Sequence, residues 1–307
     1  MKAVLAKEPF SDPGWIFERK LDGIRCLAFR EGGGVRLRSR TGRLLNGGFP
    51  ELVDALERDR CRDFVVDGEI VALKDGVTSF SRLQGRMGVS DPAAARRSGI
   101  AVFLYLFDVL RLDRCDLTAT PLRERKALLR RSLTFAAPLR FVQHRNERGE
   151  QLYREACRQG LEGLIAKRAD SAYVHGRSRD WLKLKCSHEQ ELVIGGFTAP
   201  RGSRAHFGAL LVGCYEKGEL RYAGKVGTGF GREELERLGG RMRELEQARP
   251  PFADVHPVPR DARWTRPELV AQVAFSEWTR DGRLRHPRYL GLRDDKPAAE
   301  VVRERPS

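Results

Sequence analysis

The chain has 307 residues, a formal net charge of +15 and hydrophobic residues at 41% of its positions. This length exceeds one typical core and suits two domains, and the hydrophobic content excludes a disordered chain. There is no long apolar run and no apolar stretch at the start, so we expect a cytoplasmic protein without a membrane segment or secretion signal. The positive excess favours nucleic acid as a partner.

The first part of the chain is predicted to mix strands and helices. Strand-like runs cover 35–40, 64–73, 100–110, 161–168 and 180–186. Helical patterns cover 121–133 and 149–160, and Gly160 ends the second one.

After about residue 187 the pattern changes to short strands with glycine turns. We expect a hairpin tip at Lys217-Gly218 and one helix over 232–250, interrupted by Gly239-Gly240. Short strands with a single helix are typical of a small OB-type barrel. The predicted architecture is therefore an α+β domain over 1–187 and an all-β OB-fold domain over 188–307.

The six cysteines are scattered, at positions 26, 61, 115, 157, 186 and 214, and none forms a C-x-x-C pair. This spacing argues against a zinc ribbon. In a long chain without a secretion signal, reduced thiols are the expected state.

The stretch "WIFERKLDGIRCLAF" (15–29) places Lys20, Asp22 and Arg25 close together. A lysine amine is a nucleophile only when deprotonated, and neighbouring cations or partial desolvation favour that form. The alternative is a solvated hairpin with Asp22-Gly23 at its turn. This stretch alone leaves both interpretations open.

Two further segments carry acids. In "VVDGEIVAL", Asp67 and Glu69 share one strand face, because side chains alternate with a period of two. One of them suits a ribose hydroxyl or magnesium, which prefers oxygen ligands, and a hairpin tip is the alternative. In "LEGLIAKR", Glu162 and Lys167 are an odd number of residues apart, so a regular strand would turn only Glu162 toward a site.

Lys183 and Lys185 in "WLKLKC" lie on one strand face. Neighbouring lysines repel unless an anion lies between them, and a phosphate is the natural candidate, with a solvated edge strand as the alternative. Phe107, in "YLFDVL", would either stack on a base or fill the core, which is the commoner fate of a phenylalanine.

In order, the motifs K-x-D-G-x-R, S-R-x-G, D-G-E, F-D, E-G and K-x-K resemble the covalent nucleotidyltransferases: ATP-dependent DNA ligases, RNA ligases and mRNA capping enzymes. The tail "LRHPRYLGLRDDK" (284–296) resembles the last motif of DNA ligases. "FPEL" (49–52), "LEGLIAKR" and "LRYAGKVGTGF" (220–230) are most similar to bacterial end-joining ligases of the ligase D type. The resemblance covers residues 15–296 and implies an ATP-grasp-like nucleotidyltransferase domain followed by an OB-fold domain.

The resemblance also implies ATP-dependent sealing of 3′-OH/5′-phosphate nicks in DNA repair or end joining, by way of a lysyl-AMP on Lys20. The catalytic residues it implies are Lys20, Asp22 and Arg25. The nucleotide-binding residues it implies are Glu18 at the adenine, Phe107 stacked on the base, Glu69 at the ribose, Arg40, Lys183 and Lys185 at the phosphates, and Arg293, Asp295 and Lys296 at the pyrophosphate. Glu69 and Glu162 would hold Mg²⁺ or Mn²⁺.

The implied partners are nicked duplex DNA and end-joining proteins such as Ku, and the implied form is a nucleoid-associated monomer. Thr41 stands where end-joining ligases commonly have asparagine, and Tyr289 replaces a common phenylalanine. Thr41 bears on DNA-end preference more than on adenylylation.

Two alternatives remain. One is an RNA ligase or a GTP-dependent capping-type enzyme, against which the R-x-D-K tail argues. The other is a non-catalytic OB protein that binds nucleic acid, which explains the charge but not the co-occurrence of the motifs.

Overall fold

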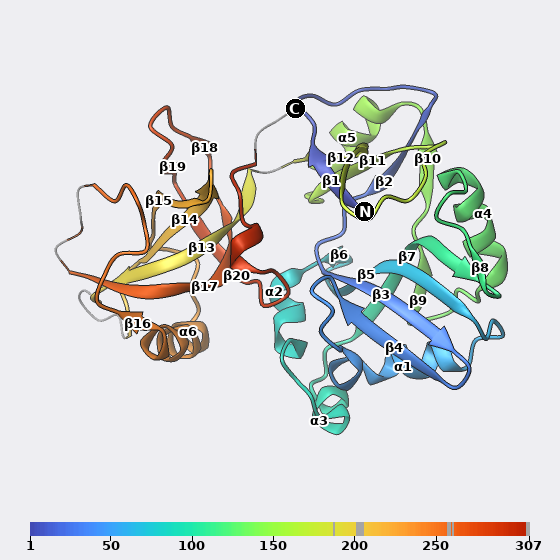
Figure 1. Cartoon of the computed structure of the whole chain (residues 1–307), viewed down its shortest axis with the longest axis horizontal. Helices are drawn as coiled ribbons and strands as arrows, with labels where there is room; N and C mark the ends of the chain where they lie inside the picture. The colour runs from blue at the N-terminus through green and yellow to red at the C-terminus, as the bar shows by residue number, and fades with distance from the viewer. Residues whose placement is uncertain (187, 201–205, 257–258, 260, 305–307) are drawn as a thin grey trace. The chain divides into compact units, whose positions relative to one another are not determined.

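The structure is a computed structural model that describes residues 1–186, 188–200, 206–256, 259 and 261–304. The chain forms two compact units, Met1–Cys186 and Ser187–Glu304, each with its own hydrophobic core (Figure 1). The first unit mixes helices and strands, and the second is mostly β-structure with one longer helix. Among the described residues, we find no helix with the length and apolarity needed to cross a membrane.

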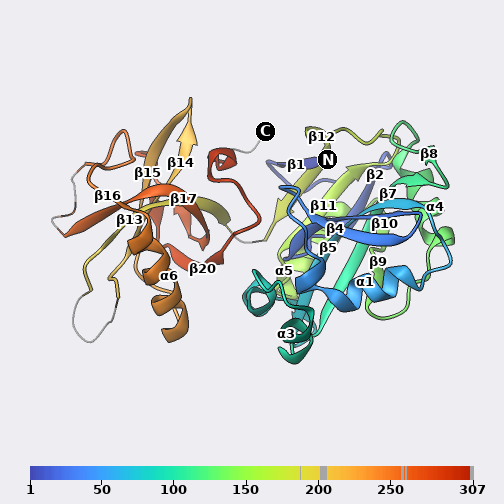
Figure 2. The same ribbon diagram turned by 60° about the horizontal axis from the view of Figure 1, so that its bottom comes forward.

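One sheet of the first unit has the strand order β4-β3-β5-β7-β8, with β6 beside β5 and β9 beside β7. Its strands are β3 (Ile24–Glu31), β4 (Gly34–Ser39), β5 (Phe64–Lys74), β6 (Val77–Thr78), β7 (Val102–Leu112), β8 (Cys115–Asp116) and β9 (Leu139–Phe141). The helices beside it are α1 (Pro50–Glu57), α2 (Phe80–Leu83), α3 (Pro92–Arg97) and α4 (Leu122–Ser132). Leu52 and Leu56 of α1 pack in the core on one sheet face, and Figure 2 shows α1 along that sheet.

The other sheet of this unit has the order β1-β12-β11-β2-β10. Its strands are β1 (Lys2–Leu5), β2 (Trp15–Arg19), β10 (His144–Asn146), β11 (Gly163–Arg168) and β12 (Arg177–Lys185). The outer face packs on α5 (Gly149–Arg158), where Ala156 meets Phe17, Leu164 and Leu184. The inner face meets the first sheet, with the Trp181 and Phe107 rings 5.8 Å apart. The two sheets therefore pack face to face through a shared cluster of buried residues.

The second unit is a sheet with the order β15-β14-β13-β17-β16, in which β20 also pairs with β17. Its strands are β13 (Glu189–Thr198), β14 (Leu210–Glu216), β15 (Glu219–Val226), β16 (Glu246–Gln247), β17 (Ala262–Ala274) and β20 (Arg288–Leu292), with β18 (Glu277–Trp278) and β19 (Leu284–Arg285) as a separate hairpin. The predicted hairpin tip is confirmed, since Lys217 and Gly218 both have positive φ between β14 and β15.

The predicted break in the helix of this unit is wrong. α6 runs without interruption over Arg232–Glu244. Gly239 is buried, and a Cβ there would lie 2.9 Å from the Cβ of His206. Glycine is therefore present because another segment packs closely against the helix, and its propensity cost is offset by that packing.

The prediction that all the cysteines are reduced is also wrong. Cys157 in the last turn of α5 and Cys186 just after β12 form a disulfide, with their Cα atoms 5.1 Å apart. The described chain holds its other four cysteines as free thiols. The pair was hidden because α5 covers β12 only in the folded unit, which brings together residues 29 positions apart.

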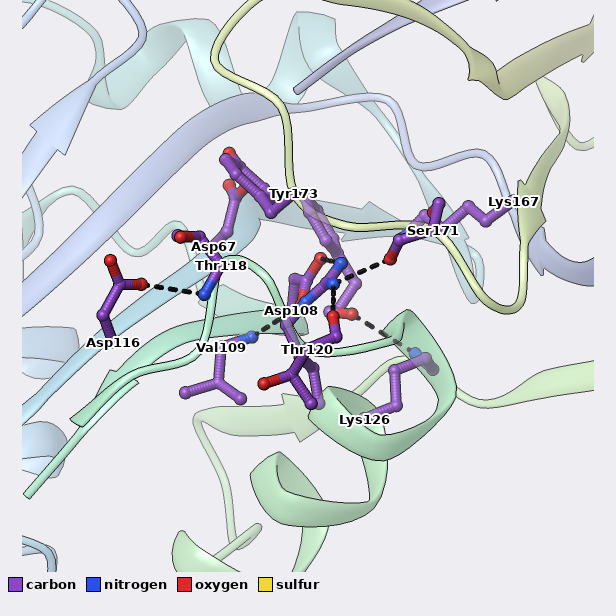
Figure 3. A network of polar contacts seen from close by, with 12 residues as sticks. Asp67, Asp108, Val109, Asp116, Thr118, Thr120, Lys126, Lys167, Ser171 and Tyr173 are labelled. Carbon is purple, nitrogen blue, oxygen red and sulfur yellow. Dashed lines mark hydrogen bonds and ion pairs between the residues drawn. The ribbon is translucent and has the colours of Figure 1, made fainter.

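A buried ion pair joins β7 to α4. Both side chains of Arg125 and Asp108 are fully buried, and their two contacts measure 2.8 and 2.9 Å. Arg125 also donates to the carbonyls of Thr120 and Ser171, and Figure 3 shows these carbonyls beside Asp108. Such a group is costly to disrupt, because the remaining partner stays buried without compensation.

We predict that Arg125→Met lowers the free energy of unfolding of the first unit by about 3–5 kcal/mol, the range for breaking a buried pair. Arg96→Met is the matched control, because its ion pair with Asp54 is exposed and such pairs contribute about 0–1 kcal/mol. Urea unfolding followed by circular dichroism measures both. Equal costs for the two variants would contradict the prediction.

Candidate active site

The segment that carries Lys20 passes from one sheet to the other. Residues 20–23 connect β2 to β3, which lie in different sheets, so the hairpin interpretation is wrong. The Lys20 amide donates to the carbonyl of Gly163 at 2.9 Å. A Cβ at Gly23 would lie 2.2 Å from the carbonyl oxygen of Ile70, so only glycine allows this approach to β5.

Asp22 fixes this segment to the start of α2. Its amide donates to Thr78 Oγ1 at 3.2 Å, and its Oδ2 accepts from the Phe80 amide at 3.1 Å. These two hydrogen bonds of Asp22 position the backbone beside Lys20.

Lys20 Nζ contacts Glu162 Oε1, and the two side chains are only 19% and 11% exposed. Burial opposes the charge of Lys20, but the carboxylate of Glu162, with those of Asp22 and Glu69, holds its pKa above the ordinary value. The lysine is therefore an ammonium paired with Glu162 before any nucleotide binds.

Arg25 extends from β3 toward Asp67 on β5. Its Nε and Nη2 each donate to one Asp67 oxygen at 2.5 Å, and Tyr173 Oη donates to Asp67 at 2.7 Å. Burial would raise the pKa of Asp67, but Arg25 keeps it below the ordinary value, so Asp67 is ionised. Glu69 pairs with Arg25 in register, and both acids act electrostatically on Arg25. Asp67 and Glu69 therefore both lie near Arg25, as expected for two residues on the same face of one strand.

Glu18 lies between two buried lysines. Its carboxylate oxygens are 2.5 Å from Lys126 Nζ of α4 and 2.5 Å from Lys167 Nζ of β11, and all three side chains are nearly inaccessible. Burial would raise the pKa of Glu18, but the two lysines lower it. The ammonium of Lys167 also lies 4.2 Å from the ring centre of Phe107 and 4.1 Å from that of Trp181.

The prediction that only Glu162 faces the site is therefore wrong, because Lys167 also points inward. The regular strand begins at Gly163, which has φ of +140°, so alternation does not extend back to Glu162. Lys126 and Lys167 were both missed. A lysine inside the apolar run "LEGLIAKR" was a signal for Lys167, whereas Lys126 sits in a helix rich in basic residues and gave none.

Phe107 is only 8% exposed and packs in the cluster that holds Trp181 and Tyr173. Besides Lys167, the guanidinium of Arg25 lies 4.9 Å from its ring centre. The ring thus fills the core and contacts cations, and its stacking on a base stays a prediction.

Lys183 and Lys185 share one face of β12, as the alternation predicts. They pair in register with Ile165 and Gly163 of β11, whereas Leu182 and Leu184 pack toward α5. Both lysines are half-buried, as are Arg40, which follows β4, and Glu69 in β5. Lys20 and Lys185 both neighbour Gly163, the first residue of β11. The structure therefore brings Lys20, Glu162 and this lysine pair to the same end of strands β11 and β12.

A cavity of about 700 Å³ is lined by the chain neighbours of Lys20, whereas Lys20, Glu162, Lys183 and Lys185 are not among its lining residues. Its walls include Glu18, Arg19 and Leu21 next to the nucleophile candidate, Tyr105 of β7, and residues of α5. This volume is in the range of small-molecule sites.

The tail residues lie in the second unit, after β20. Arg293 and Asp295 form a two-point ion pair, with both contacts at 2.9 Å, and Lys296 lies 2.7 Å from Glu191. Their predicted contact with pyrophosphate stays a prediction.

The donor set near Lys20 fits a magnesium ion together with substrate phosphates. In the described part of the chain, no three His, Cys, Asp or Glu residues cluster in a way that holds a metal. Magnesium needs only one or two carboxylates when phosphates and waters supply the other ligands. Among the described atoms, Glu162 Oε2 is buried without a hydrogen-bond partner, and Glu69 acts on the same lysine.

Burial lowers the pKa of Lys167 to about 8, with Glu18 raising it and Lys126 lowering it further. We predict that Glu18→Gln shifts this pKa below 8 and that Lys126→Met shifts it upward. NMR titration of ¹³Cε-labelled lysine measures both shifts, with the exposed Lys7 as the reference signal.

The lowered pKa of Lys167 also determines whether its contribution to folding stability rises or falls with pH. Because the folded value lies below the ordinary 10.5, the unfolded chain binds more protons between these values. The contribution of Lys167 to stability therefore rises with pH across this window and falls as the pH drops toward 8. A Lys167→Met variant whose stability keeps the wild-type slope in this window would contradict the assignment.

Two family models match the chain. The model described as the ATP dependent DNA ligase domain matches residues 2–185, and the model described as the ATP dependent DNA ligase C terminal region matches residues 203–296. The first covers most of the first unit, and the second falls within the second unit. The matches confirm the predicted order of a nucleotidyltransferase domain and an OB-fold domain.

Curated relatives and solved structures match the same family as the two models. The chain is 40% identical over 301 residues to the multifunctional non-homologous end joining protein LigD of Pseudomonas aeruginosa, covering 95% of this chain and 35% of that protein. It is 40% identical over 296 residues to LigD of Mycobacterium tuberculosis, covering 94% of this chain and 37% of that protein. It thus spans about a third of the length of these relatives.

Among solved structures, a mycobacterial DNA ligase D complexed with ATP and MES is similar at a TM-score of 0.67 and 35% identity, with 99% of this chain and 98% of that chain covered. With its motifs, its two units and these matches, the chain belongs to the ATP-dependent DNA ligase family.

Proposed function

We propose that this chain is an ATP-dependent DNA ligase that seals 3′-OH/5′-phosphate nicks through a lysyl-AMP on Lys20. The observation that carries the proposal is the contact of Lys20 with Glu162 between two sheets, at the strand end that carries Lys183 and Lys185. Arg19 and Leu21, on either side of Lys20, line a cavity of about 700 Å³. One amine, a cationic pair and an unsatisfied carboxylate oxygen are the groups that nucleotidyl transfer needs.

In the first step Lys20 Nζ attacks the α-phosphorus of ATP. The new N–P bond replaces the bond to the pyrophosphate oxygen, and pyrophosphate leaves. Glu162 Oε1 already contacts Nζ and is placed to take the proton that the ammonium must lose. Lys183 and Lys185 would stabilise the charge that develops on the α-phosphate oxygens, and Arg40 would bind the outer phosphates.

Glu162 and Glu69 would hold Mg²⁺ or Mn²⁺, which when bound neutralises phosphate charge. Asp22 positions the backbone beside the nucleophile, and Arg25 with Glu69 would contact the ribose. Glu18, held by two lysines, lines the cavity and would lie at the adenine, and Phe107, whose ring contacts one of these lysines, would stack on the base.

In the later steps AMP passes from Lys20 to the 5′-phosphate of a nick, and the 3′-hydroxyl then displaces AMP to join the strand. Residues 1–187 and 188–307 are the two proposed domains, and Arg293, Asp295 and Lys296 of the second would orient the pyrophosphate. The net charge of +15 supports binding to nicked duplex DNA. We further propose that the protein acts as a monomer in the nucleoid. There it would take part in end joining together with a protein such as Ku.

We predict that ATP and magnesium add one AMP to the chain and that Lys20→Ala abolishes the adduct, because the variant lacks the amine that contacts Glu162. Intact-mass spectrometry measures the adduct, with Lys7→Ala as the control. Parallel reactions with GTP and NAD test the alternative donors. An unmodified wild-type chain, or an adduct formed only with GTP, would contradict the proposal.

A second prediction separates the steps of the reaction. Lys20→Ala should still seal a nick that already carries a 5′-adenylate, because strand joining does not use the lysine as a nucleophile. A gel assay of strand joining measures this, with an unadenylated nick as the control substrate. Sealing of the unadenylated nick by the variant would show that Lys20 is not the nucleophile.

A further inference from the structure

The disulfide of the first unit lies where β12 ends and β11 begins, next to Lys185 and Glu162. Cys186 directly follows Lys185, and its bond to Cys157 closes a stretch of chain that contains all of β11 and β12. That stretch carries the proposed metal ligand and the proposed phosphate-binding lysines. Both cysteines are half-buried, so small thiols can reach them.

The backbone of Cys186 also holds Glu162. The Cys186 amide donates to the Glu162 carbonyl at 3.0 Å, and the next residue, Gly163, accepts from the Lys20 amide at 2.9 Å. A continuous path therefore runs from α5 through the disulfide to the backbone of Glu162, whose carboxylate contacts the nucleophile. A shift of Cys186 would therefore act on the backbone of Glu162 through this hydrogen bond.

The same helix holds Lys185 and forms a wall of the cavity. Tyr153, one turn before Cys157, donates its hydroxyl to the Lys185 carbonyl at 2.8 Å. Leu152, Glu155 and Ala156 of α5 line that cavity. The disulfide and the tyrosine are thus two tethers between one helix and the strand end that carries Lys185.

We propose that Cys157–Cys186 is a reversible redox site that controls reaction with ATP, with the oxidised form the more active. This inference rests on the proposed function of Lys20. A dithiol reductant supplies two electrons and two protons, the S–S bond becomes two thiols, and the reductant is oxidised to its own disulfide. Opening the bond removes the covalent link between α5 and this strand end, while the Tyr153 hydrogen bond and the packing of Ala156 on Leu184 remain, so Glu162 and Lys185 lose part of their positioning.

The experiment compares wild-type chain oxidised with glutathione disulfide and reduced with dithiothreitol, with the thiol state checked by alkylation and mass. The rate of AMP adduct formation is measured across ATP concentrations. We expect reduction to lower kcat/KM about tenfold, because misplacing reacting groups by a fraction of an ångström costs this much or more. Cys61→Ser/Cys115→Ser, which removes the two more accessible free thiols, should respond like wild type.

Cys157→Ser/Cys186→Ser should react at the reduced rate under both conditions. Tyr153→Phe should slow the reaction more in the reduced form than in the oxidised form, because the two tethers hold the same strand end. Equal rates for oxidised and reduced wild type, or a redox response that persists in the double serine variant, would overturn the inference. No adduct in either form would instead overturn the proposed function of Lys20.

Discussion

The contact between Lys20 and Glu162 is the interaction on which the site depends. It forms only because the chain leaves one sheet after Arg19 and enters the other at Ile24, so that Lys20 is held in the passage between them. Glycine at position 23 permits that passage, and Asp22 anchors it to the start of α2. The fold thus holds the Lys20 amine between the two sheets, and the residues around it come from both of them.

The buried and half-buried charged side chains between the two sheets form ion pairs. Asp67 neutralises Arg25, Glu162 faces Lys20, and Glu18 is shared by Lys126 and Lys167. The last group has one more cation than anion, and the rings of Phe107 and Trp181 lie against the surplus ammonium. This group therefore keeps a net positive charge next to the cavity that Glu18 lines.

The sequence predicted several elements and the strand face shared by Lys183 and Lys185, for physical reasons that act locally. Alternation placed Lys183 and Lys185 on one face, and the positive φ of Gly160 ended α5 where expected. Errors arose wherever tertiary contacts decided the outcome. The helix continued through Gly239 because His206 packs against it, and Cys157 met Cys186 because α5 covers β12. Lys126 and Lys167 were missed because only the folded cleft brings both to Glu18.

We propose that geometry, and not amine acidity, selects the lysine that reacts with ATP. Lys167 has the lower pKa, about 8, but it is held against Glu18, whereas Lys20 faces Glu162 and the phosphate-binding pair. Peptide mapping of the chain after reaction with α-labelled ATP tests this most directly. The account predicts an acid-labile label on the peptide that contains Lys20. A label on Lys167, or on any other lysine, would contradict it.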